Sequence, residues 1–210
     1  MAFNRKARLA GNIEAIRTAF ALDRGHRVPT AEERKTLERY CGFGGLKCIL
    51  NSAGSLADAA QWTKSDLDLF SPTAELHRMI RENSADERTY KRYMDSLKSS
   101  VLTAFYTPAE ITETISGVLK ENGIAPLRML EPSAGRGAFV DAFLRDNPQA
   151  EVMAFEKDLL TGKVLSHLYP EQRVRIEGFE RIEKPFEEYF DVAVSNVPFG
   201  DDSSTSMASR

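Results

Sequence analysis

The chain has 210 residues, of which 42% are hydrophobic, and a formal net charge of −3. It is long enough for one large domain or two small ones with a sizeable core. The sequence has no apolar run near the ~20 residues that a membrane-spanning helix needs, and the first residues lack the apolar stretch of a signal peptide. We therefore expect a cytoplasmic protein with no membrane partner.

The charge distribution and the two cysteines bear on whether the protein binds nucleic acid or a metal. Residues 1–50 carry ten Lys/Arg against five Asp/Glu, whereas residues 101–210 carry 11 against 18. A basic first segment could contact nucleic acid, and a solvated helical surface explains it equally well. Cys41 and Cys48 lie close together without a His partner, so we expect reduced thiols and no metal site.

The first hundred residues predict helices and no strand. Apolar residues recur at helical spacing over residues 6–22, and Thr30 with Glu33 forms a capping box for a helix through Leu37 and Tyr40. A glycine-rich segment, Gly42-Phe43-Gly44-Gly45-Leu46, terminates that helix. Further helices are predicted over residues 55–69, 71–83 and 86–102. We assign residues 1–100 to an all-helical N-terminal module.

A loop over residues 103–108 leads into a helix that Asn122-Gly123 terminates. Thr107 is the predicted N-cap and Pro108 the first helical residue, and Thr107 with Glu110 would form a capping box. The predicted buried face consists of Ile111, Ile115, Val118 and Leu119.

Strands and helices then alternate, which predicts an α/β fold with a parallel, doubly wound sheet of about four strands over residues 101–200. Ligands of such sheets bind at the carboxyl ends of the strands. Residues 201–210 are polar and Ser-rich, which predicts a mobile tail. The predicted strands cover residues 127–131, 151–156, 173–177 and 190–195, and the helices between them cover residues 137–146 and 158–168.

A glycine-containing loop, residues 131–137, follows the first strand. Gly135 and Gly137 have no side chain, so a ligand can approach the backbone closely. The third glycine of the dinucleotide fingerprint is absent, and Glu131 would repel a diphosphate but attract an ammonium group. An adenosine ligand without phosphate is therefore favoured, and Glu156, about 20 residues past the loop, is placed to accept its ribose hydroxyls. Glu131 could instead be a strand-end acid that caps the next helix.

Asn196-Val197-Pro198-Phe199 ends the last predicted strand. An aromatic amine such as that of adenine is a poor nucleophile, because its lone pair is delocalised into the ring. The side-chain oxygen of Asn196 and the main-chain carbonyl of Val197 could hold its hydrogens and stabilise the positive charge that develops during attack. Phe199 offers a face on which a flipped base can stack. The alternative is an ordinary Asn-x-Pro turn with a buried Phe.

Taken together, these motifs resemble those of amino-group DNA methyltransferases that use S-adenosylmethionine, in the order of the adenine-specific branch. The motifs are residues 105–108, 131–137, Glu156 and 196–201. The closer likeness is to the methylase portion of large helicase–methylase proteins of conjugative elements. In those proteins a Gly-Trp-Gly-Gly-Leu segment precedes the methylase motifs, and here residues 42–46 occupy that place.

The resemblance implies a partial Rossmann-like methyltransferase sheet, S-adenosylmethionine as cofactor, DNA as partner and the adenine N6 amine as target. Where the family usually has an Asp–Phe pair for the cofactor adenine, this chain has residues 177–180, with Phe179 against the ring and Glu180 near its amino group. The implied catalytic residues are Asn196, Val197, Pro198 and Phe199. The implied cofactor-binding residues are Tyr106, Thr107, Pro108, Glu131, Pro132, Ser133, Ala134, Gly135, Gly137, Glu156, Lys157 and Phe179.

A methylase sheet of this type has seven strands, whereas about four are visible here. We therefore expect a truncated enzyme or a short relative, whose last strand is an open edge covered by a second copy, by the N-terminal helices or by a further C-terminal region. Two other functions remain open. One is a catalytically incomplete module of a larger protein that binds the cofactor or DNA, and the other is methylation of a protein glutamine or an RNA amine.

Overall fold

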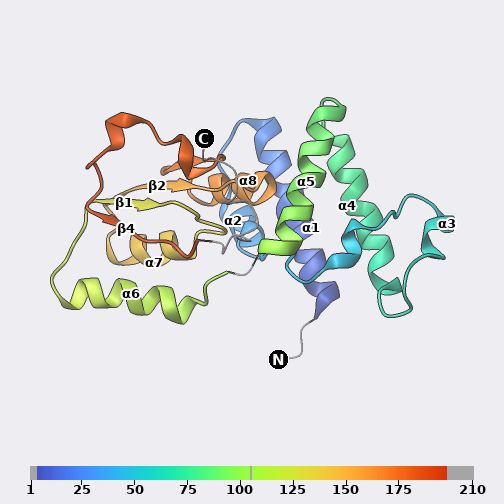
Figure 1. The fold of residues 1–210 in the computed structure, drawn as a ribbon, viewed down its shortest axis with the longest axis horizontal. Coiled ribbons are helices and arrows are strands. Elements are labelled where there is room, and N and C mark those ends of the chain that lie inside the picture. The colour runs from blue at the N-terminus through green and yellow to red at the C-terminus, as the bar shows by residue number, and fades with distance from the viewer. Residues whose placement is uncertain (1–3, 105, 198–210) are drawn as a thin grey trace, which may run out of the picture.

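The computed structural model describes residues 4–104 and 106–197, and shows a mixed α/β protein (Figure 1). The helical first part lies at one end of the molecule and a four-stranded parallel sheet at the other. Within the described residues, no helix is both long enough and apolar enough to cross a membrane.

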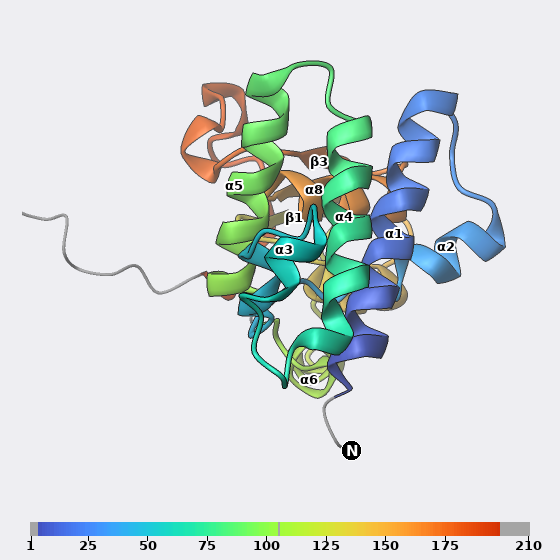
Figure 2. The ribbon, with the colours of Figure 1, turned by 90° about the vertical axis from the view of Figure 1, so that its right-hand side faces the viewer.

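Three longer helices of the first part run side by side, with α4 between α1 and α5 (Figure 2). The helices are α1 (Arg5–Gly25), α2 (Ala31–Leu37), α3 (Leu56–Ala59), α4 (Phe70–Glu82) and α5 (Glu87–Thr103), with 3₁₀ turns at Lys47–Leu50 and Leu67–Leu69. The helices predicted over residues 6–22, 71–83 and 86–102 are therefore confirmed as α1, α4 and α5.

Two predictions in this region need correction. The capping box of Thr30 and Glu33 is present, but α2 ends at Leu37 and does not reach Tyr40. The helix predicted over residues 55–69 is wrong, because only the single turn of α3 and a 3₁₀ turn form there. Ser55 and Asp58 do form a capping box. However, Leu56 is 91% exposed and α3 has no buried residue, so this turn lacks an apolar face that would stabilise a longer helix.

The second part has the predicted order of strands and helices. All strands pair in parallel in the order β3-β2-β1-β4, with Met129 opposite both Val152 of β2 and Val192 of β4. The strands are β1 (Arg128–Glu131), β2 (Glu151–Phe155), β3 (Arg173–Arg175) and β4 (Val192–Ala193), and the helices are α6 (Ala109–Glu121), α7 (Ala138–Asp146) and α8 (Leu159–Leu168).

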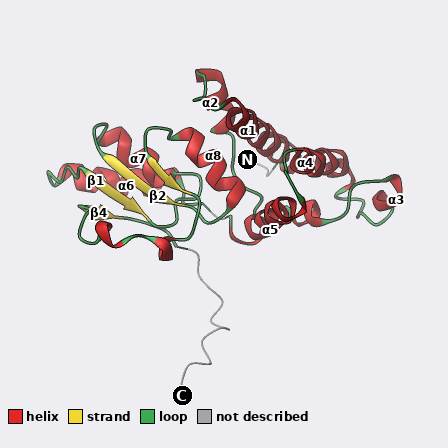
Figure 3. Cartoon of the chain, turned by 90° about the horizontal axis from the view of Figure 1, so that it is seen from above, coloured by secondary structure: helices red, strands yellow, loops and turns green. Residues whose placement is uncertain are grey.

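Alternate residues of the strands face opposite sides of the sheet. Met129, Val152 and Ala154 share a core cluster with residues of α7 and α8, which lie on one side (Figure 3). Leu130, Met153 and Phe155 pack against Ile182, Phe186 and Phe190 of the connection from β3 to β4. The chain thus winds in one direction from β1 to β3 and then returns past β1 to β4. The junction of β1 and β4 is where such sheets bind ligands.

The start and the packing of α6 differ from the prediction. Pro108 is the N-cap residue and no side chain caps the helix, so the predicted cap at Thr107 is wrong. The predicted buried face is also wrong, since Ile111, Ile115 and Val118 are 39–51% exposed. Helix α6 instead packs on α7 through small polar residues, with Ser116 Oγ donating to Ala142 O at 3.1 Å.

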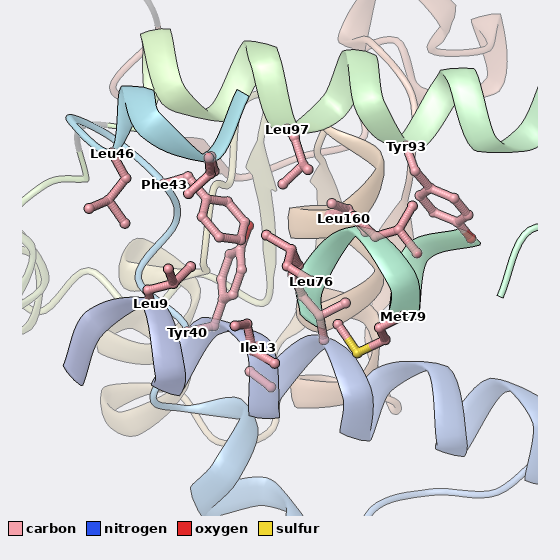
Figure 4. Close-up of a cluster of buried hydrophobic side chains, with 14 of the residues drawn as sticks. Leu9, Ile13, Tyr40, Phe43, Leu46, Leu76, Met79, Tyr93, Leu97 and Leu160 are labelled. Atoms are coloured by element: carbon pink, nitrogen blue, oxygen red, sulfur yellow. The ribbon is translucent and has the colours of Figure 1, made fainter. Parts of the chain in front are cut away.

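The largest core cluster joins the helical part to the sheet part. It contains residues of α1, α4 and α5 together with Leu160, Val164 and Leu168 of α8. Figure 4 shows Leu160 among side chains of these helices. The Asp23 carboxylate of α1 also pairs with Lys163 and His167 of α8. The helical part therefore holds α8 in place, and the segment after β2 depends on it.

This shared core predicts a large effect for Leu160→Ala. Leu160 is 1% exposed, and truncating a fully buried Leu typically lowers the free energy of unfolding by about 2–5 kcal/mol. Urea denaturation measures the change. The matched control is Leu56→Ala, at 91% exposure, which should change stability by less than about 0.5 kcal/mol. Equal effects of the two substitutions would contradict the shared core.

Strand β4 occupies one edge of the sheet. The N-terminal helices contact α8 rather than running along β4. The prediction that these helices shield the last strand is therefore wrong. Pairing of this edge with a second copy or with a further C-terminal region stays a prediction. The predicted tail, residues 201–210, lies outside the described residues.

Candidate functional site

A cavity of about 370 Å³ opens at the carboxyl ends of β1 and β2 and at the segment after β4. We call it the first cavity. It brings together Gly135 of the glycine loop, Glu156 at the end of β2 and Asn196 beyond β4, which are up to 61 residues apart in sequence. The strand order explains this convergence, because parallel neighbours end at the same edge of the sheet. Its other lining residues are Ser100, Leu102, Thr103, Ala104, Tyr106, Ser133, Asp158, Thr161 and Val197.

Glu156 ties the glycine loop to the start of α8. The backbone N–H of Gly135 donates to Glu156 Oε2 at 2.7 Å, and that of Asp158 donates to Oε1 at 2.7 Å. Burial raises the pKa of Glu156 to about 7, and the hydrogen bond from Asp158 opposes that rise. A carboxylate has about four acceptor positions, so each oxygen can still accept a hydroxyl group. The loop-anchoring role of Glu156 was not visible in the sequence.

Glu131, the last residue of β1, is fully buried and lacks a partner. Within the described part of the chain, neither of its carboxyl oxygens accepts or donates a hydrogen bond. Burial raises its pKa to about 8, and the polar groups of the Ser195 side chain and the Ser133 backbone oppose that rise. The predicted alternative, a cap for the following helix, is not what the structure shows, because Gly137 is the N-cap of α7 and no side chain caps it.

Asn196 is held by the segment that precedes α6. Its Nδ2 donates to Thr107 Oγ1 at 3.2 Å, across 89 residues of sequence. This hydrogen bond fixes the orientation of the amide of Asn196, which lines the first cavity. The first motif of the α/β part, Tyr106-Thr107-Pro108, and the last one therefore meet directly. Thr107 acts as a partner of Asn196 and not as a helix cap.

A second cavity of about 670 Å³ adjoins the first and shares with it Thr103, Ser133, Glu156, Asp158 and Val197. Phe179 contributes a ring that is 38% exposed and packs edge-on against Phe155, with 5.6 Å between centroids. Lys157 Nζ lies 4.0 Å from a carboxylate oxygen of Glu180 at the same cavity. Pro132 also lines it. Several of the residues predicted to bind an adenosine ligand thus line two adjoining cavities that share Glu156.

Some predicted residues, including Glu131 and Thr107, do not line these two cavities. Ala134 is buried, and its N–H donates to Phe155 O at 2.8 Å. Gly137 has a φ of 88° and borders a separate cavity beside Arg136. Pro108 begins α6. The predicted residues Pro198 and Phe199 lie outside the described residues.

Helix α5 supplies residues that sequence reasoning missed. Ser96 Oγ donates to Asp158 Oδ2 at 2.7 Å and accepts the N–H of Leu160 at 3.0 Å, which fixes the start of α8 beside the cavities. The wall formed by α5 consists of Arg92, Asp95, Ser96, Ser99, Ser100, Leu102 and Thr103. The small polar residues of this group recur at helical spacing, which is a signal that the sequence already contained.

Two glutamates with raised pKa values, Glu131 and Glu156, predict a pH-dependent stability. Their pKa values in the folded protein, about 8 for Glu131 and about 7 for Glu156, lie above the ordinary value of 4.5. Between those limits the folded state binds more protons than the unfolded state. Each group therefore lowers the free energy of unfolding by about 1.4 kcal/mol per pH unit as pH rises. Urea denaturation from pH 5 to pH 8 measures the slope. Glu131→Gln should flatten it, and an unchanged slope would contradict the assignment.

The fold and these cavities define a mixed α/β protein with a ligand-sized cleft at the carboxyl edge of a parallel sheet. Among known proteins, the chain is 36% identical over 102 residues to Defense against restriction protein B of Escherichia phage P1. The matched part is 47% of this chain and 4% of that protein, so the chain spans only a small fraction of its relative. No family model matches the chain, and no solved structure does.

Proposed function

We propose that the protein transfers a methyl group from S-adenosylmethionine to the exocyclic N6 amine of adenine in DNA, on a Rossmann-like methyltransferase sheet. The observation that carries the proposal is the first cavity, where Gly135, Glu156 and Asn196 meet. The hydrogen bond from Asn196 to Thr107 supports it, because it joins the two outer motifs at that cavity.

The residues present fit the cofactor. Glu131 is a buried carboxyl at the end of β1 with no hydrogen-bond partner in the described chain; it lines neither cavity directly, and an ammonium group bound beside it would favour its ionised form. Glu156 retains acceptor positions for two ribose hydroxyls. Phe179 offers an exposed ring to adenine at the second cavity. When bound, the cofactor supplies an electrophilic methyl group on a sulfonium.

The chain itself would activate the target amine. Asn196 Oδ1 and the carbonyl oxygen of Val197 would accept hydrogen bonds from the two amine hydrogens. These two oxygens would stabilise the positive charge that develops on the nitrogen. Thr107 keeps the Asn196 amide in the orientation that leaves Oδ1 free. These interactions strengthen as the amine becomes cationic, which is the requirement for a contribution to rate rather than to binding alone.

DNA is favoured as substrate by the relative's printed name. Restriction is the cleavage of DNA, and a protein named for defence against restriction acts on that process. Methylation of adenine in DNA is a modification by which such cleavage is blocked. A protein glutamine or an RNA amine could be held by the same two acceptors, and these substrates are the alternatives for the experiment below.

A second candidate function is that of a binding module within a larger protein. The two-residue strand β4 leaves the sheet with a short, open edge, and the matched relative is far longer than this chain. Such a module would bind S-adenosylmethionine without turning it over.

Two measurements separate these functions. Calorimetry with S-adenosylmethionine and S-adenosylhomocysteine tests the cofactor site, and binding of both is expected. Transfer of a tritiated methyl group is then followed with unmethylated DNA, RNA and a glutamine-containing peptide in parallel. Label on DNA supports the enzyme, cofactor binding without transfer supports the module, and label confined to RNA or peptide changes the substrate. Absence of cofactor binding would contradict the proposal.

A further inference from the structure

The glycine segment of the helical part, residues 42–46, is fixed in place by buried polar contacts. Asn12 of α1 is fully buried, its Nδ2 donates to Gly42 O at 2.7 Å, and its Oδ1 accepts the N–H of Cys41 at 2.9 Å. The N–H of Phe43 donates to Ser100 Oγ of α5 at 3.2 Å. The segment therefore has a defined position relative to both α1 and α5.

This segment lies against the residues that lead into the α/β part. A Cβ atom built on Gly42 would lie 2.6 Å from the hydroxyl oxygen of Tyr106 and 2.8 Å from the Cβ of Ala104. A Cβ built on Gly44 would overlap the carbonyl oxygen of Ala104. A Cβ atom at Gly42 or Gly44 would therefore fit only if residue 104 or 106 moved, so both glycines lie in close contact with those residues.

The opposite edge of the Tyr106 ring lies against a second glycine, Gly135. A Cβ built on Gly135 would lie 2.9 Å from both Tyr106 Cδ1 and Cε1. Tyr106 itself lines the first cavity with Glu156 and Asn196. The ring thus fits between a glycine of the helical part and the glycine whose N–H is bonded to Glu156.

We infer that Gly42, within the glycine segment 42–46, is a positioning residue of the first cavity that acts through Tyr106. Gly42 fixes where the phenol ring lies, the ring fixes how closely the chain approaches Gly135, and that spacing sets the space for the methionine part of the cofactor. The inference rests on the proposed function only for the identity of the ligand. It assigns the helical part a role in the site that its sequence did not reveal.

Gly42→Ala tests the inference against a closely matched control. Gly42 and Gly45 have similar positive φ values, 65° and 77°, so alanine is strained at both. A Cβ on Gly45 meets nothing within 4 Å, whereas one on Gly42 meets Tyr106. We expect Gly42→Ala to weaken binding of S-adenosylhomocysteine by about 10-fold or more, and Gly45→Ala by less than about 2-fold. Equal affinities for the two variants would overturn the inference.

A readout without ligand separates this inference from the proposed function. In ¹⁵N-labelled protein, the amide resonances of Gly135 and Asp158 report the two hydrogen bonds to Glu156. Gly42→Ala should shift them and Gly45→Ala should not. If the wild type binds no cofactor, the proposed function fails while these shifts still decide the positioning role. Unshifted resonances in Gly42→Ala would overturn it.

A third variant covers the case in which Gly42→Ala does not fold. Tyr106→Leu leaves the glycine segment intact and removes the ring that it holds. We expect Tyr106→Leu to shift the Gly135 and Asp158 amide resonances and to lower the affinity for S-adenosylhomocysteine about as much as Gly42→Ala. Its melting temperature should be close to that of Gly45→Ala. Wild-type resonances and wild-type affinity in Tyr106→Leu would show that the ring positions nothing.

Discussion

Glu156→Gln should lower the affinity for S-adenosylmethionine by about 10²–10⁴-fold. The carboxylate would accept two ribose hydroxyls, and hydrogen bonds to a charged group contribute about 1.5–3 kcal/mol each. The amide of Gln has one acceptor oxygen, and that oxygen is needed by the N–H groups of Gly135 and Asp158. Isothermal titration calorimetry measures the loss, and the melting temperature without ligand shows how much of it arises from the loop.

The matched control for this experiment is Glu177→Gln. Glu177 also lines the second cavity, where Arg175 neutralises its charge. The substitution removes one negative charge from the same region without removing the ribose acceptor, so affinity should change by less than about 3-fold. If Glu156→Gln binds as tightly as the wild type, the ribose assignment is wrong, and the role of Glu156 is confined to anchoring the loop.

Asn196→Ala should reduce the rate of methyl transfer by about 10²–10³-fold while cofactor affinity stays within about 2-fold. A rate loss of this size is typical when one preorganised group that stabilises transition-state charge is removed. Asn196 makes its hydrogen bond to Thr107 at the exposed mouth of the cavity, so its loss leaves Glu156 and Gly135 undisturbed. Single-turnover transfer to DNA and calorimetry separate the two effects.

Thr107→Val supplies a graded test of the same assignment. It keeps the shape of the side chain but removes the acceptor for Asn196 Nδ2, so the amide can rotate and the rate should fall less than in Asn196→Ala. The control is Asn122→Ala, at the C-terminal end of α6, opposite the end that Thr107 precedes, which should transfer methyl groups at the wild-type rate. A loss of cofactor binding in Asn196→Ala would place that residue in the cofactor site instead.

Local patterns predicted the elements and their order well. The period of apolar residues predicted α1, α4 and α5, and the alternation of apolar runs with amphipathic stretches predicted four parallel strands with three helices. The predicted packing of α6 proved wrong because it required knowledge of what lies alongside the helix. The apolar stripe of α6 was expected to be buried, yet Ile111 and Val118 are each about half exposed.

The sequence by itself determined the residues with distinctive chemistry and their placement at strand ends, because strand period, glycine turns and terminal polar residues are local properties of the chain. Only the tertiary structure decided which of those ends meet. The order β3-β2-β1-β4 places Asn196 beside Gly135 and Glu156, and contacts within the helical part, from Asn12 and Ser100, place Gly42 against Tyr106. Those contacts join residues tens of positions apart, and their geometry depends on packing volumes that a linear pattern does not contain.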